Sequence, residues 1–84
     1  MDIREVWGIP KARIGAFLHS QADVLPCGED RFSFLGCSIC LTELPDRAAG
    51  PLSFPNTRVE FHGPESETAE IYRRFVLHFI SAGG

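Results

Sequence analysis

The order of patterns along this chain of 84 residues predicts an α+β fold with two layers. Residues 10–22 and 64–82 carry apolar side chains at the three- and four-residue spacing of helices that face a core. Between them, residues 31–41 and 57–62 contain the alternating apolar and polar positions of half-buried strands. We therefore expect one small globular domain over residues 1–84. It is a two-layer sandwich in which a small antiparallel sheet of three or four strands has an N-terminal and a C-terminal helix on one face.

The composition limits the classes of partner. A net charge of −3 argues against a protein that binds nucleic acid through a clustered basic face. No apolar run approaches the roughly 20 residues that span a bilayer, and the start of the chain lacks the pattern of a signal peptide. We expect a cytoplasmic protein with no nucleic-acid partner, no membrane partner and no cofactor.

The first two segments are separated by Gly8-Ile9-Pro10, which redirects the chain. Asp2 to Trp7 is expected to form a single helical turn. Pro10 suits the first position of a helix, and Ile14, Phe17 and Leu18 then follow at helical spacing. This stretch predicts the N-terminal helix.

The strand region contains a change of phase. A short extended piece at Val24-Leu25 and a turn over residues 26–30 precede Phe32 and Phe34, which lie at even positions. The apolar residues that follow lie at odd positions: Cys37, Ile39 and Leu41. On one flat strand the two sets would face opposite sides of the sheet. We expect a β-bulge or a tight bend at Gly36 to bring them to one face.

Residues 45–56 contain three prolines and a glycine without any period, which predicts a long connection. Leu52 and Phe54 lie between these prolines. We expect them to fold back over the edge of the core. The alternative is that they form an exposed contact site.

The C-terminal helix is the clearest element. Pro64 begins it, acidic residues come early and basic residues late, as the helix dipole favours. The residues expected to face the sheet are Tyr72, Phe75, Val76, Phe79 and Ile80. This arrangement leaves Ile71 and Leu77 on the flank of the helix.

The pair Cys37-Ser38-Ile39-Cys40 followed by Leu41 resembles the opening of a RING finger. The further ligands of that family are missing, since only His62 and His78 follow as ligand types. A single zinc site could use Cys27, Cys37, Cys40 and His62, which are the right number for tetrahedral coordination. A strand at Cys37 to Cys40, however, sends the two thiols to opposite faces. We therefore interpret both as small side chains that fill space.

The sequence contains no phosphate-binding loop, paired-carboxylate motif or HExxH spacing, so no enzyme class is indicated. We expect a non-enzymatic module for protein interaction or homodimerisation. Its contact surface would be the open sheet face, the flank at Ile71 and Leu77, or the segment with Leu52 and Phe54. The alternative is a small zinc-binding or thiol-redox protein that uses the Cys-x-x-Cys pair.

Overall fold

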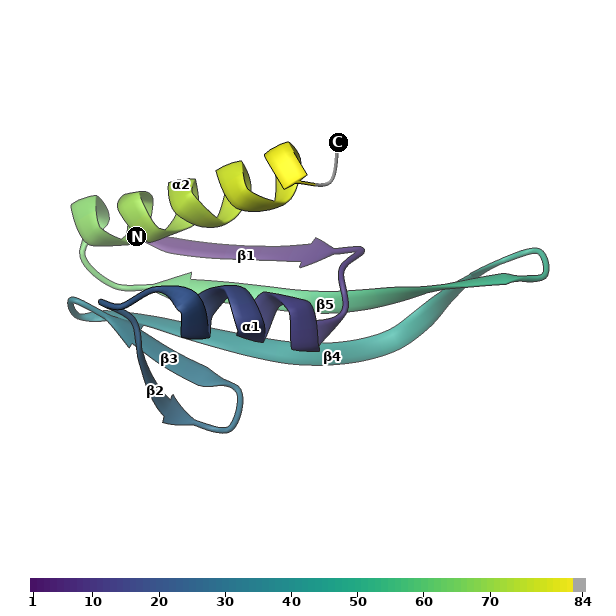
Figure 1. Cartoon of the computed structure of the whole chain (residues 1–84), viewed down its shortest axis with the longest axis horizontal. Coiled ribbons are helices and arrows are strands. Elements are labelled where there is room, and N and C mark those ends of the chain that lie inside the picture. The colour runs from purple at the N-terminus through teal and green to yellow at the C-terminus, as the bar shows by residue number, and fades with distance from the viewer. Residues whose placement is uncertain (83–84) are drawn as a thin grey trace.

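The computed structural model describes residues 1–82 and the side chains of residues 1–80. Its elements, in order, are β1 (Asp2–Trp7), α1 (Lys11–Ser20), β2 (Leu25–Gly28), β3 (Arg31–Phe34), β4 (Cys37–Ala49), β5 (Leu52–His62) and α2 (Glu65–Ala82). The strands form one antiparallel sheet in the order β1-β5-β4-β3-β2, and both helices lie on one of its faces (Figure 1). The predicted class is confirmed. The predicted number of strands is wrong, because the sheet has five.

One additional strand is β1, where we expected a helical turn. It pairs with β5 in unbroken register, from Asp2 opposite His62 to Trp7 opposite Thr57. An isolated helical turn fixes several residues for few hydrogen bonds. Pairing with β5 instead satisfies the inward backbone groups of the whole segment and places Ile3 and Trp7 against the helices.

The second difference lies at Gly36, where the chain reverses completely. Leu35 and Gly36 have φ values of 47° and 86° and form a two-residue hairpin turn between β3 and β4. The tight bend is confirmed, and the bulge is wrong. Because the chain doubles back, Phe32 lies opposite Ile39 and Phe34 opposite Cys37 on the buried face.

The core lies between the helix layer and one face of the sheet. Its residues are Ile14, Phe17, Leu18, Val24, Phe32, Phe34, Cys37, Ile39, Leu41, Val59, Phe61, Ile71, Phe75 and Phe79. The ring of Phe75 is central, with centroids 4.9 Å from Trp7, 5.7 Å from Phe61 and 5.1 Å from Phe79. These edge-to-face contacts join β1 and β5 to α2.

The bounds of α2 agree with the prediction, but its buried side is rotated relative to the predicted one. The inward stripe consists of Thr68, Ile71, Phe75 and Phe79. Ile71 is therefore 0% exposed rather than on the flank, and Ile80 is exposed rather than facing the sheet. The segment around residues 75–80 is apolar on almost all sides, so its pattern alone leaves the phase undetermined.

Arg74 connects α2 to two neighbouring segments. Its guanidinium donates to Glu70 at 2.8 Å and to Asp23 at 2.9 Å, and lies 5.0 Å from the ring centroid of Phe34. The hydrogen bonds from Arg74 lower the pKa of both carboxyls. Their contribution to stability is therefore present above the ordinary carboxyl pKa and is lost as the pH falls through the lowered values.

We expect Leu35→Asn to raise the free energy of unfolding by about 1 kcal/mol, because leucine is disfavoured at positive φ and asparagine tolerates it. Leu35 is 68% exposed, so the change removes little apolar burial. Urea unfolding measures the effect. Leu25→Asn, at an exposed leucine on β2 without positive φ, is the matched control and should not stabilise the protein. Equal effects of the two substitutions would contradict the explanation.

Candidate interaction surface

β4 and β5 continue past the part of the sheet that the helices cover and form a two-stranded arm, residues 45–55 (Figure 1). Beyond the pair of Leu44 with Asn56, the arm pairs Arg47 with Phe54 and Ala49 with Leu52. The predicted connection is thus a hairpin. Leu52 and Phe54 do not fold back over the core, and they are 59% and 40% exposed.

A bulge on β4 marks the base of the arm. Leu44 pairs with Asn56 and Arg47 pairs with Phe54, so two residues of β4 lie opposite one residue of β5. Pro45 and Asp46 occupy this bulge. Proline has no N–H for the ladder, so a bulge is one of the few places in a sheet that accept it.

One side of the arm is apolar and continues the open face of the sheet. Residues alternate along β5 without interruption, so Phe54 and Leu52 share the side of Asn56 and Arg58. The guanidinium of Arg47 lies 6.0 Å from the ring centroid of Phe54. On the opposite side, the hydroxyl of Ser53 donates to the carboxylate of Asp46 at 3.0 Å. The arm therefore has one side suited to an apolar contact and one polar side.

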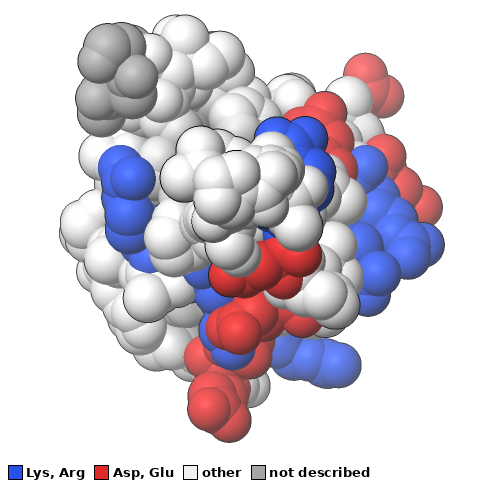
Figure 2. Space-filling model, turned by 90° about the vertical axis from the view of Figure 1, so that its right-hand side faces the viewer, with Lys and Arg blue, Asp and Glu red and all other residues white. Residues whose placement is uncertain are grey.

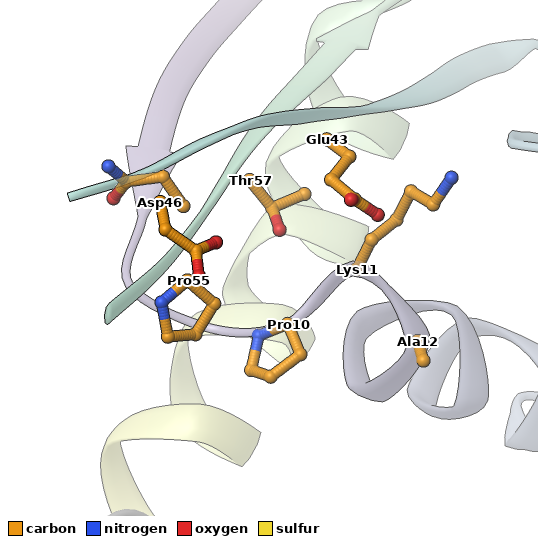
Figure 3. Close-up of a pocket in the computed structure, with 8 residues that line it drawn as sticks. Pro10, Lys11, Ala12, Glu43, Asp46, Pro55 and Thr57 are labelled. Atoms are coloured by element: carbon orange, nitrogen blue, oxygen red, sulfur yellow. The ribbon is translucent and has the colours of Figure 1, made fainter. Parts of the chain in front are cut away.

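A pocket of about 200 Å³ lies where the arm leaves the body (Figure 3). It is lined by Pro10, Lys11, Ala12, Glu43, Asp46, Pro55, Asn56 and Thr57. Thr57 donates its hydroxyl hydrogen to the carbonyl oxygen of Ile9 at 2.6 Å, and the Lys11 ammonium bonds Asp30 at 3.0 Å, which raises the pKa of Lys11. The pocket brings prolines and charges of both signs together.

The open face of the sheet is polar over the body. His62 pairs with Asp2, and Arg58 donates to Glu60 at 3.2 Å. A solvated face is ordinary for an antiparallel sheet. Seen from the end of the molecule that carries the arm, charges of both signs and uncharged surface are interspersed (Figure 2). Neither sign of charge dominates this view.

The cysteines lie in three different environments. Cys37 is 0% exposed in the core, Cys40 is on the open face, and Cys27 is exposed on β2. The prediction that Cys37 and Cys40 point to opposite faces is confirmed. Across the described residues, no group of three or more His, Cys, Asp or Glu side chains could hold a metal ion. The zinc-binding and redox alternatives remain predictions.

The four predicted contact residues do not form one surface. Leu52 and Phe54 lie together on the arm, Leu77 is exposed on the outer side of α2, and Ile71 is in the core. Sequence reasoning did not single out Val6 or Leu25, which are exposed on the two edge strands. Strand alternation could have indicated Val6, had β1 been recognised as a strand.

Comparison with known proteins identifies no family. No protein-family model matches the chain, and no curated protein matches it. None of the helices in the described part of the chain is long and apolar enough to cross a membrane. The function of the arm is therefore inferred from the position and exposure of its own residues.

We expect a thiol reagent to modify Cys27 and Cys40 in the native protein. Cys37 should react at least about a hundredfold more slowly, because its reaction requires opening of the core. Mass spectrometry of digested samples at timed intervals gives the three rates. Labelling of Cys37 at the rate of Cys27 would show that the Cys37 side chain does not lie in the core.

Native mass spectrometry under reducing conditions tests the zinc alternative. After growth in zinc-rich medium, we expect the mass of the chain alone, because Cys37 and Cys40 point to opposite faces. A stoichiometric added mass of one zinc ion, lost in Cys40→Ser, would instead establish the metal-binding alternative.

Proposed function

We propose that this chain is a non-enzymatic protein-interaction module and that the arm is its contact element. The observation that carries the proposal is an apolar side, with Leu52 and Phe54, on a hairpin that projects beyond the helix layer. The free thiols support a reducing, cytoplasmic location.

The rest of the protein contributes little to the stability of the arm. A two-stranded ribbon without a covering layer is marginally stable in water. Burial of one large apolar side chain contributes about 1.5–3 kcal/mol, so a partner that covers Leu52 and Phe54 would also stabilise the hairpin. Binding and ordering of the arm would then be coupled.

The chemistry of the apolar side also fits a contact. Aromatic and arginine residues are enriched among the residues that dominate binding energy at protein interfaces. Phe54 and Arg47 lie directly opposite each other, with the guanidinium 6.0 Å from the centroid of the ring. The complementary surface is an apolar groove with an acidic rim, on a different protein or on another copy of this chain.

A photo-crosslinking residue tests this contact. With benzoylphenylalanine in place of Phe54, illumination in cells that naturally express the protein should give a covalent adduct of one defined mass. An adduct of twice the 9.3 kDa chain identifies self-association, and another mass identifies a different protein.

The matched control carries the same residue in place of Leu35. That side chain is at least as exposed but lies on the turn between β3 and β4. We expect no defined adduct there. Equal crosslinking from positions 35 and 54, or none from position 54, would refute the arm as the contact element.

A further inference from the structure

The two edges of the sheet differ in how readily they could accept another strand. β2 has four residues, includes Pro26, and is interrupted by a bulge between Pro26 and Gly28. Short length, proline and bulges are features by which proteins prevent edge pairing. β1 has six residues, no proline and an unbroken register. Of the two edge strands of the body, β1 is the one open to a further strand.

Half of the backbone groups of β1 point away from the sheet. Met1 and Gly63 exchange two backbone hydrogen bonds, with N···O distances of 2.8 and 3.2 Å. Bonded and non-bonded pairs alternate along an antiparallel ladder, so Ile3 and Glu5 also bond inward. The residues whose N–H and C=O groups face outward are Asp2, Arg4 and Val6.

We propose that a second copy of this chain pairs with this edge, with the two β1 strands antiparallel about a two-fold axis at Ile3. Each Asp2 then lies opposite Arg4 of the other copy. These two pairs use outward backbone groups on both sides and form four hydrogen bonds. Both pairs also place opposite charges next to each other on the open face. The two Ile3 side chains meet on the helix side.

The other registers are less favourable. An axis at Arg4 places the Arg4 side chains of the two copies opposite each other. An axis at Glu5 places the two Glu5 carboxylates opposite each other. Like charges directly opposite each other destabilise a strand pair. A shift by one residue pairs outward groups with inward ones. Among the antiparallel registers in which outward residues of the two copies pair at two or more positions, only the one with its axis at Ile3 places opposite charges, Asp2 and Arg4, next to each other.

The helix layer is compatible with the same axis. The hydroxyl of Tyr72 donates to the Glu5 carboxylate at 2.9 Å, and α2 runs in the same direction as β1 (Figure 1). Two residues back along β1 correspond to about four residues of helix, which brings the turn of Thr68 and its exposed neighbour Ala69 near Ile3. Glu65 and Arg73 are exposed four residues on either side of Ala69. An antiparallel second α2 would bring each Glu65 toward Arg73 of the other copy.

This surface is separate from the arm. A two-fold axis at Ile3 leaves the two arms projecting from opposite ends of a ten-stranded sheet, with Leu52 and Phe54 uncovered. The inference therefore goes beyond the proposed function. The two can fail independently, because the arm is tested by crosslinking at position 54 and the edge by variants at positions 2 and 4.

Sedimentation equilibrium with exchanged charges tests the edge. We expect the wild-type chain to form a dimer of twice 9.3 kDa. Asp2→Arg and Arg4→Asp each create like-charge pairs and should weaken the dimer by roughly tenfold or more. The double variant D2R/R4D exchanges the charges and should restore it. Arg31→Asp, at an exposed arginine of β3 away from the edge, is the matched control and should leave the dimer unchanged.

Cysteine crosslinking provides a readout that does not depend on charge. In a C27S/C40S background, Asp2→Cys and Arg4→Cys proteins should form a disulfide when mixed and oxidised, because a bonded antiparallel pair has Cα atoms about 5.5 Å apart. Neither protein alone should form it. Circular dichroism checks that each variant is folded.

Three results would overturn the proposal: a wild-type monomer at several hundred micromolar, no recovery in D2R/R4D, or a dimer lost in Leu52→Ser and unaffected by both charge reversals. The last result would assign self-association to the arm.

Discussion

The contacts of Phe75 are those on which the rest of the structure depends. Its ring meets Trp7 from β1, Phe17 from α1, Phe61 from β5 and Phe79 from its own helix. This cluster fixes both helices on one face of the sheet. The buried face of the body ends near Thr57, whose hydroxyl bonds the chain just before α1. Beyond that point β4 and β5 have no helix to cover them, so the position of the aromatic cluster also determines where the exposed arm begins.

The parts of the fold that could be predicted are those with a clear local period. The bounds of α2 follow from Pro64 and a helical pattern, and the opposite orientations of Cys37 and Cys40 follow from strand geometry. The arm was not predicted because its three prolines are typical of a loop. They are tolerated because Pro45 lies at a bulge, Pro55 lies on β5 opposite that bulge and Pro51 lies at the turn.

Other features depend on partners that lie far away in the sequence. β1 contains Glu5 on its buried side, which hides the alternation. This carboxylate is accommodated because Trp7 and Tyr72 both donate to it, and Tyr72 is 67 residues away. The phase of α2 likewise depends on which side meets Phe17 and Phe61. For the candidate site, the sequence favoured Leu52 and Phe54 folding back over the edge of the core, with an exposed contact site as the alternative. Their exposure follows from the lack of a covering helix, which no local pattern records.

The separation of the arm from the core has an evolutionary consequence. The side chains of residues 47–54 make no contribution to the aromatic cluster. Substitutions there would change the surface that we propose for recognition while leaving the folding energy of the body nearly constant, as is general for loops held on a rigid scaffold. Under the proposed function, selection for a new binding specificity and selection for a stable fold therefore act on different residues, and the body can be kept while the arm diverges.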